Sequence, residues 1–345
     1  MRQIGVGTFK LVYQARWQQP HGASSEVAVL RIRGSGSAGR MKEFEQEVKI
    51  FQHLGFHPKL LQLLAITNEP GSGDYCMVTE LASKGALDVI LSSLAKERQT
   101  LSLLVQLQVA RQICDGMVHL ALHGVVHGDL ATRNVLVFRL DARNHLDVSV
   151  KVADYGLSII SARWYRQSHA ASFNTARSMT RPVRWMAPES IERRQFSEKS
   201  DVWAFGVTMW EIWTYAEKIP YESVSEDSLV ETKVLGGERL PRSPSCPAAV
   251  YSIMLECWRE RKSERPGFSD LQRKLQQHDL TVAESSSEDE PDDYSQQCVI
   301  CLEREAVWAL IPCGHMCLCE VHKEGAASRP CPICRSNPTS VHRIY

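Results

Sequence analysis

Three short polar segments, arranged in a fixed order, constrain the fold of this 345-residue chain more than any other feature. Residues 127–134 read His-Gly-Asp-Leu-Ala-Thr-Arg-Asn, residues 154–156 read Asp-Tyr-Gly, and residues 186–189 read Met-Ala-Pro-Glu. One segment of this kind could be a coincidental acid-rich loop, but three in this order are improbable by chance. The segments therefore indicate a single functional site that is assembled from several loops.

The three segments resemble the catalytic loop, the metal-binding loop and the P+1 segment of a protein kinase, with Tyr155 in place of the usual phenylalanine. The resemblance implies transfer of a phosphoryl group from ATP to a protein substrate. Asp129 would accept the hydroxyl proton, and Asn134 and Asp154 would hold Mg²⁺. It also implies an α+β, bilobal kinase fold over residues 1–278, with a β-rich N-lobe and an α-helical C-lobe.

The first strands carry a glycine-rich loop in which one glycine is replaced. Residues 4–13 resemble the kinase loop G-x-G-x-x-G-x-V, whose backbone covers the nucleotide phosphates. Gly5, Gly7 and Val12 match this pattern. Lys10 stands where the third glycine is expected.

The lysine that kinases carry on the third strand is absent. Residues 27–30, Val-Ala-Val-Leu, stand where kinases have V-A-I-K, so Ala28 matches and would border the nucleotide. Leu30 replaces the lysine. Arg31 is next to it, but adjacent residues of a strand face opposite sides of the sheet, so Arg31 is expected to point away from the site.

This loss and gain of a lysine resembles the with-no-lysine kinases, in which a lysine at the third-glycine position reaches the same phosphates. Lys10 occupies that position, and its flexible side chain can approach the phosphates from the loop. Glu47, within a helical pattern over residues 43–53, would pair with it. The alternative is that Lys10 is a solvated charge on the degenerate loop of an inactive kinase.

Other segments resemble parts that hold the adenine and the catalytic loop. Thr79 would be the gatekeeper, and the backbone from Glu80 to Ala82 would contact the adenine. Asp201 resembles the helical aspartate that fixes the backbone of the catalytic loop. Glu189 and Arg265 resemble the ion pair that anchors the C-lobe.

The catalytic loop and the P+1 segment also bear on the class of substrate. The run Asp-Leu-Ala-Thr-Arg-Asn, which includes Arg133, differs by one residue from the pattern of tyrosine kinases, and residues 182–189 resemble the tyrosine-kinase P+1 loop. Transfer to serine or threonine is the alternative. Gly128 replaces the arginine that normally pairs with a phosphorylated activation-loop residue, so activity is expected to be largely independent of phosphorylation at Tyr165 or Tyr155.

Charge and hydropathy narrow the possible partners. The chain has 40 Lys and Arg against 40 Asp and Glu, and this balance gives no reason to expect nucleic acid as a partner. No apolar run is long enough for a membrane span, and the first residues lack the apolar stretch of a secretory signal. Residues 279–297 are acidic and nearly devoid of apolar residues, which predicts a flexible linker.

Cysteine and histidine residues cluster after this linker, with spacings typical of zinc ligands. Two tetrahedral Zn²⁺ ions need eight ligands. The candidates are Cys298, Cys301, Cys313, His315, Cys319, His322, Cys331 and Cys334. Cys317 is an alternative ligand whose spacing is poor. Clustered thiols of this kind point to a reducing compartment, so a cytoplasmic location is expected and a nuclear one is compatible.

The ligand order resembles a RING finger of the neuralized and inhibitor-of-apoptosis families over residues 298–335, with His322 replacing a usual cysteine. The resemblance implies a cross-brace, in which one ion takes the first and third ligand pairs and the other takes the second and fourth. It also implies binding of a ubiquitin-conjugating enzyme and ubiquitin, with Ile300, Pro332 and Arg335 as contacts. A RING-mediated dimer and a purely structural zinc clip both stay open.

Together these patterns predict a protein kinase, tyrosine-specific by its motifs, that is joined to a RING-type ubiquitin ligase. A protein substrate, ATP, Mg²⁺ and two Zn²⁺ ions are the expected partners and cofactors. The main alternative is a catalytically inactive pseudokinase that recruits clients to the RING ligase. A third is an adaptor with neither activity.

Overall fold

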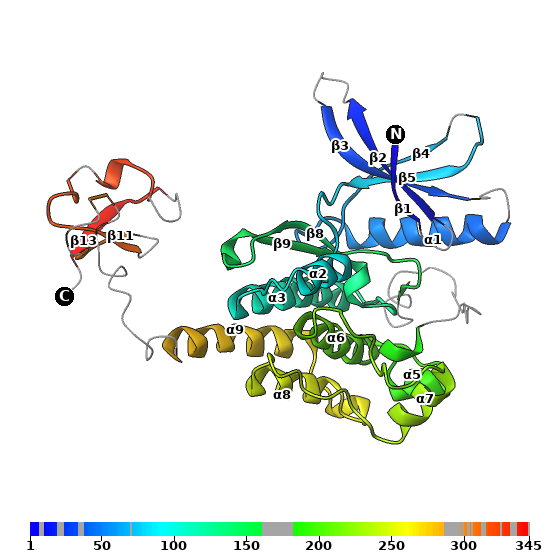
Figure 1. Ribbon diagram of the computed structural model, residues 1–345. Coiled ribbons are helices and arrows are strands. Elements are labelled where there is room, and N and C mark those ends of the chain that lie inside the picture. Colours follow the sequence, from blue (N-terminus) through cyan, green and yellow to red (C-terminus); the bar gives the residue numbers. More distant parts are fainter. Residues whose placement is uncertain are drawn as a thin grey trace. The chain divides into compact units, whose positions relative to one another are not determined.

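The computed structural model describes residues 1–6, 10–18, 24–33, 38–69, 71–160, 182–285, 298, 300–301, 304, 306–311, 315–324, 326–331 and 337–343. The chain divides into two compact units, Met1–Asp279 and Leu280–Tyr345. Figure 1 shows a sheet and a long helix at the start of the first unit, followed by a helical part. This arrangement confirms the predicted α+β class and the β-rich and helical lobes.

An antiparallel five-stranded sheet in the order β1-β2-β3-β5-β4 opens the first unit. Its strands are β1 (Arg2–Val6), β2 (Lys10–Gln18), β3 (Ser24–Ile32), β4 (Leu63–Asn68) and β5 (Tyr75–Glu80). Helix α1 (Ala38–Leu54) buries Phe44, Val48 and Phe51 in a core that includes Met77 of the sheet. Their spacing places these three side chains on one face of the helix. Other sheet residues, Val29 among them, form a separate small core.

The helical part of this unit is built around a nearly fully buried helix, α6 (Glu198–Trp213). Its side chains from Val202 to Trp213 are mainly apolar, because other elements surround this part of the helix. Ser197 and Ser200 form a capping box at its first turn, which satisfies backbone N–H groups that a helix start leaves unpaired. The other helices are α2 (Leu87–Lys96), α3 (Leu103–Leu122), α5 (Pro188–Arg193), α7 (Asp227–Leu235), α8 (Ala248–Cys257) and α9 (Phe268–Ser285).

Short strands place two of the three polar segments. Strands β6 (Gly85–Ala86), β8 (Val135–Leu140) and β9 (Val148–Val152) form one small sheet, and β7 (Val125–Val126) pairs with β10 (Ile159–Ile160) in another. The catalytic-loop segment therefore lies between β7 and β8, and contains the 3₁₀ turn η1 (Thr132–Asn134). The Asp-Tyr-Gly segment lies between β9 and β10. The remaining 3₁₀ turns are η2 (His145–Asp147), η3 (Val183–Trp185) and η4 (Lys262–Glu264).

The second unit contains a three-stranded sheet in the order β12-β11-β13. Its elements are β11 (Trp308–Ile311), β12 (His315–Leu318), the 3₁₀ turn η5 (Ala326–Ser328) and β13 (Ser340–Arg343). Strand β13 follows residue 335, where the RING finger was expected to end, and pairs with β11 in an unbroken register. Helix α9 continues to Ser285, past the predicted start of the linker, whereas residues 286–297 lie outside the described residues.

Among the described residues, no helix has both the length and the hydropathy that a membrane span requires.

Candidate active site and metal centre

Lys10 is the centre of an ion cluster that draws on three distant parts of the chain. Its Nζ donates to Glu47 Oε1 on α1 at 2.6 Å and to Asp154 Oδ1 of the Asp-Tyr-Gly segment at 3.1 Å. The side chain of Glu47 is only 4% exposed, and that of Lys10 is 21% exposed. A carboxylate buried so deeply requires a cationic partner, so this geometry does not fit a solvated Lys10.

The three charges shift each other's pKa values. Burial acts to lower the pKa of Lys10, but Asp154 and Glu47 outweigh it and hold that pKa above its ordinary value. Lys10 is in turn the main cause that lowers the pKa of Asp154. Burial raises the pKa of Glu47, and the ammonium opposes this effect. Lys10 therefore keeps its proton, and its positive charge, at neutral pH.

The Asp-Tyr-Gly backbone is shaped to bring Asp154 into this cluster. Asp154 has a φ of 63°, a left-handed conformation that residues other than glycine adopt only where the surroundings enforce it. The N–H of Gly156 donates to Asp154 Oδ1 at 3.3 Å. A Cβ on Gly156 would lie 3.2 Å from that oxygen and 3.7 Å from Lys10 Nζ, so glycine allows the close approach.

The third strand does not supply a cation to this site. Leu30 lies opposite Val12 of β2 and Met77 of β5 in the strand register, and it packs against the core under α1. Arg31 Nη1 donates to both carboxylate oxygens of Glu69, at 2.8 and 2.6 Å, in the β4–β5 turn. Arg31 is therefore held at the turn, as the alternation of side chains along a strand predicts.

The residues predicted to border the nucleotide lie on four adjacent strands. Gly5 pairs with Val12 across β1 and β2, and a Cβ on Gly5 would be 3.4 Å from Val12 Cβ. Ala28 pairs with Thr79 across β3 and β5, and Thr79 is 1% exposed. Gly7 lies outside the described residues.

The segment from Glu80 to Ala82, which is predicted to contact the adenine, has only its backbone free to do so at Glu80, because the carboxylate of Glu80 is bonded to Lys151. Lys151 Nζ on β9 donates to both carboxylate oxygens of Glu80, at 2.7 and 2.6 Å. The carbonyl oxygen of Ala82 accepts from Gly85 N–H at 3.1 Å. Within the described part of the chain the N–H of Ala82 donates to no other group, so it is available to a nitrogen of an adenine ring.

The catalytic loop orients its aspartate with two neighbours. Arg133 Nη2 donates to Asp129 Oδ1 at 2.5 Å, and Asn134 Nδ2 donates to Asp129 Oδ2 at 2.9 Å. Asn134 Nδ2 also donates to the backbone carbonyl of Asp129 at 2.7 Å. Because the amide nitrogen faces Asp129, the amide oxygen is the atom of Asn134 that can ligate a metal. Amide and carboxylate oxygens, as supplied by Asn134 and Asp154, are ligands that Mg²⁺ accepts.

The buried Asp201 on α6 fixes the backbone on which Asp129 stands. Its carboxylate accepts from the N–H groups of His127, at 2.7 Å, and Gly128, at 2.9 Å, which confirms the predicted anchor. Gly128 has a φ of 77°, where glycine avoids the strain that a Cβ would bring. Gly128, Asp129 and Asp201 line a cavity of about 20 Å³, large enough for one water molecule.

Glu211, which the sequence motifs do not indicate, connects the catalytic loop to the P+1 segment. Its Oε2 accepts from the N–H of Thr132 at 3.0 Å and from Trp185 Nε1 at 3.1 Å. Arg133 lies over the Trp185 ring, 4.3 Å from its centroid. Burial raises the pKa of Glu211. The available signal was a single carboxylate within the otherwise apolar run of α6.

The P+1 segment is anchored on both sides of its Met-Ala-Pro-Glu run. Arg265 Nη1 and Nη2 donate to Glu189 Oε1 and Oε2, both at 2.8 Å, which confirms the predicted ion pair. The Arg265 side chain is fully buried, and a two-pronged pair of this kind fixes orientation as well as distance. On the other side, Arg184 Nη1 donates to the carbonyl of Pro220 at 2.8 Å.

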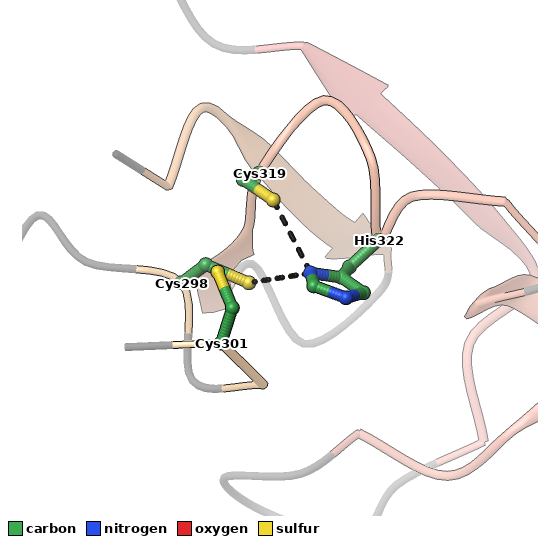
Figure 2. A group of neighbouring side chains, drawn as sticks. All are labelled: Cys298, Cys301, Cys319 and His322. Carbon is green, nitrogen blue, oxygen red and sulfur yellow. Dashed lines mark hydrogen bonds between the residues drawn. The ribbon is translucent and has the colours of Figure 1, made fainter. Parts of the chain in front are cut away.

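The second unit brings four of the predicted zinc ligands together. Figure 2 shows the thiols of Cys298, Cys301 and Cys319 around the ring of His322, and their ligand atoms all lie within 4.8 Å of one another. His322 Nδ1 is 3.5 Å from Cys298 Sγ and 3.3 Å from Cys319 Sγ. A tetrahedral Zn²⁺ with ordinary bond lengths would hold such atoms about 3.5 Å apart. This donor set therefore fits zinc, with Nδ1 as the ligating atom of His322.

The other predicted RING residues are described only in part. Cys331 is buried in the small core of this unit, and β12 begins at His315, of whose side chain nothing is described. Cys313 and Cys334 lie outside the described residues, so the second zinc ion stays a prediction. Ile300 is 53% exposed, whereas the other predicted ubiquitin-transfer contacts, Pro332 and Arg335, lie outside the described residues.

Comparison with protein families gives two matches. The family described as protein tyrosine and serine/threonine kinase matches residues 1–275. The family described as zinc finger, C3HC4 type (RING finger), matches residues 294–341, a range that includes the first residues of β13.

Several tyrosine-protein kinases are similar to the first unit. The tyrosine-protein kinase transmembrane receptor Ror of Drosophila melanogaster is 34% identical over 280 residues, which cover 80% of this chain and 38% of that protein. Human tyrosine-protein kinase Srms is 36% identical over 275 residues, 79% of this chain and 51% of Srms. Human tyrosine-protein kinase FRK is 34% identical over 278 residues, 81% of this chain and 50% of FRK. The chain thus spans between 38% and 51% of the length of each of these three relatives.

Proposed function

Because this chain belongs to the protein tyrosine and serine/threonine kinase family and carries a RING finger after the kinase domain, we propose that it phosphorylates protein tyrosines and that Lys10 holds the ATP phosphates. The ion cluster of Lys10, Glu47 and Asp154 carries the proposal. In kinases a lysine of the third strand pairs with a helix glutamate while the Asp-Phe-Gly aspartate holds magnesium. Here the same two acids meet a lysine from the glycine-rich loop.

The remaining groups fit the chemistry of phosphoryl transfer. Asp129, held by Arg133 and Asn134, would accept the proton of the attacking hydroxyl. When bound, Mg²⁺ would neutralise charge on the phosphates, with the Asn134 oxygen and Asp154 as its protein ligands. Lys10 would place its positive charge on the same phosphates, and the backbone at Ala82 would orient the adenine.

The preference for tyrosine rests on the connection between the catalytic loop and the P+1 segment. Arg133 donates to Asp129 and lies over Trp185, so one side chain ties the base to the surface that would receive the substrate. Glu211 holds this surface in place by accepting a hydrogen bond from Trp185 Nε1. The relatives described above are all named as tyrosine kinases, which supports the same preference.

Asp129→Asn is expected to lower kcat for phosphorylation of a tyrosine peptide by about 100-fold or more, the usual contribution of a positioned base. Asparagine keeps the size of the side chain and can still accept from Arg133, so the loss would report on the proton acceptor. The measurement is radiolabelled phosphate transfer from Mg²⁺-ATP by the full chain. Equal transfer to a matched serine peptide would exclude the tyrosine preference, and no transfer by the wild type would favour the pseudokinase scaffold.

Tyr165→Phe is expected to leave kcat/KM within about twofold of the wild-type value, because Gly128 offers no guanidinium to a phosphorylated activation loop. Tyr165 lies outside the described residues, and this prediction depends on Gly128 alone. Steady-state kinetics after treatment with a tyrosine phosphatase make the same comparison without a substitution. Near-complete loss of activity in either experiment would contradict the expectation.

We propose that the second unit is a RING-type ubiquitin ligase with two Zn²⁺ ions. The four-ligand group around His322 and the exposed Ile300 support this role, because a RING recruits its conjugating enzyme through an apolar surface beside the zinc sites. The kinase and the ligase would then act on the same protein client, or on the chain itself. A cluster of zinc-binding thiols fits a reducing compartment, such as the cytoplasm or the nucleus.

A further inference from the structure

Four histidines meet where helix α1 ends against the end of helix α3. His57 and His119 stack with ring centroids 4.5 Å apart and an interplanar angle of 25°. The rings of His119 and His123 are 4.0 Å apart, and His53 meets His123 edge-on at 6.0 Å. His53 belongs to the last turn of α1, His119 to the last turn of α3, and His123 is the residue that ends α3. We refer to these four side chains as the histidine junction.

Hydrogen bonds across the junction tie the two helices together. His119 Nε2 on α3 bonds the carbonyl of Leu54, the last residue of α1, at 2.9 Å. In return, His53 Nε2 on α1 bonds the carbonyl of His123 at 2.9 Å. His123 Nδ1 bonds the carbonyl of His119 at 2.8 Å. A carbonyl oxygen can only accept, so each of these three ring nitrogens carries a proton, as one neutral tautomer already provides.

His57 has the opposite role in the junction. Its Nδ1 accepts from the backbone N–H of Lys59 at 3.3 Å, so this nitrogen must be free of a proton. Burial and then the neighbouring His119 lower the pKa of His57 below its ordinary 6.5, whereas Asp115 on α3 acts in the other direction. If Nδ1 of His57 took up a proton, its N–H would face the backbone N–H of Lys59, and neither group could accept. The protonated ring would also be a cation stacked on the His119 ring.

The charged groups around the junction would not neutralise a positive charge on His57 in addition to one on a neighbouring ring. Asp115 is the one carboxylate described as acting on His57, and it is already bonded to Gln272 of α9. Lys59 opposes it from the α1–β4 connection, and Lys151 on β9 and Arg139 on β8 add positive charge near Lys59. The ends of α1 and α3 favour one cation through their exposed carbonyls, but two adjacent charged rings would repel each other.

We propose that the histidine junction is a proton-sensitive clamp, which holds α1 on α3 while Nδ1 of His57 accepts from the N–H of Lys59 and loosens when that nitrogen takes up a proton. The clamp bears on the ion cluster because α1 carries Glu47, the partner of Lys10. The same helix contacts the Asp-Tyr-Gly segment, where Phe51 meets Tyr155 with ring centroids 4.9 Å apart. Loosening the C-terminal end of α1 would therefore move Glu47 away from Lys10.

The sign of the pH effect follows from His57, whose neutral form is the one that the fold prefers. A group whose pKa is lowered by folding stabilises the fold above its ordinary pKa, here 6.5, and that contribution is lost as the pH falls toward the lowered value. The clamp is therefore expected to be closed at about pH 7.5 and to loosen toward about pH 5.5, within the range in which histidines titrate.

Amide hydrogen exchange of the full chain, corrected for the intrinsic effect of pH, tests this proposal. Between about pH 7.5 and about pH 5.5, amides of residues 50–57 and 119–124 are expected to lose protection by up to about tenfold more than those of α6, since a pH one unit below the ordinary pKa of 6.5 shifts such an equilibrium by at most about a factor of ten. An equal change in α6 would mean general destabilisation and would overturn the proposal. This readout needs no phosphoryl transfer, so its outcome is independent of the proposed kinase activity.

His57→Asn supplies the matched variant, because an asparagine oxygen can accept from Lys59 but does not titrate. In this variant the excess loss of protection at low pH is expected to shrink to within about twofold. His145→Asn, which removes a histidine of η2 outside the junction, is expected to keep the wild-type profile. If His57→Asn does not fold, proton NMR titration of the wild-type histidine rings replaces it. Independent titration of the four rings with unchanged α1 exchange would then contradict the clamp.

Discussion

Replacing Lys10 with methionine is expected to lower kcat/KM for phosphoryl transfer by about 100- to 1000-fold, the usual loss when one preorganised charge is removed from a transition state. Lys10 is the one cation that the described residues place on both Glu47 and Asp154. Methionine has a similar length and no charge. The variant would also leave two carboxylates near each other without a cation between them, and this would disturb the position of Asp154.

Arg31→Met is the matched control for Lys10→Met. It removes a cation from the same sheet by the same exchange, but Arg31 is held by Glu69 in the β4–β5 turn. Its kcat/KM is expected to stay within about threefold of the wild-type value, because a partly exposed ion pair of this kind contributes little to stability. Equal losses in the two variants would show that the Lys10 effect comes from a damaged N-lobe and not from a missing phosphate ligand.

A second variant tests whether phosphoryl transfer depends on the position of the lysine or only on its charge. Leu30 lies at the position where kinases usually have lysine, and it packs on the α1 side of the sheet, the side of Glu47. Lys10→Met combined with Leu30→Lys is therefore expected to recover about tenfold of the lost kcat/KM. Full activity of Lys10→Met alone would remove the lysine from the mechanism. A loss that Leu30→Lys does not recover would show that the position of the lysine matters and not only its charge.

Motif spacing predicted the residues of this site, because the chemistry requires particular side chains in a fixed order. It located the Lys10–Glu47 pair, since a lost lysine on one strand and a gained lysine on the neighbouring loop border the same space. It also located Asp201, whose carboxylate holds the catalytic-loop backbone. These are interactions between charged and polar groups whose partners are few, so a sequence order is enough to suggest the pairing.

The sequence could not reveal contacts that depend on how helices pack. Glu211 is buried beneath the catalytic loop because α6 passes there, and its spacing along the chain does not indicate this. His57 and His119 stack although they are far apart in the sequence, because the connection after α1 crosses the end of α3. Strand β13 was missed for a related reason. It belongs to the RING unit through its register with β11, and its four residues fall outside the ligand spacing of the motif.

Replacing Cys298 with serine is expected to abolish ubiquitin-chain formation while leaving kinase activity unchanged. The apolar core described in this unit is small, and binding of a structural Zn²⁺ contributes about 10 kcal/mol or more to folding at neutral pH. A serine hydroxyl is a poor replacement for a thiolate at Cys298, which lies 3.5 Å from His322 Nδ1. The measurements are zinc content by mass spectrometry, ubiquitination with a panel of conjugating enzymes, and phosphoryl transfer in the same preparation.

Cys317→Ala is the control for ligand choice, because Cys317 is buried in the same unit but is not part of the four-residue ligand group. It is expected to retain its zinc content and to lose about 1–2 kcal/mol of stability from packing. Loss of one zinc ion in this variant would place Cys317 among the ligands of the second site and would revise the assignment of that site. Ubiquitin-chain formation that persists in Cys298→Ser after its zinc is lost would show that the zinc site is not what makes the second unit a ligase.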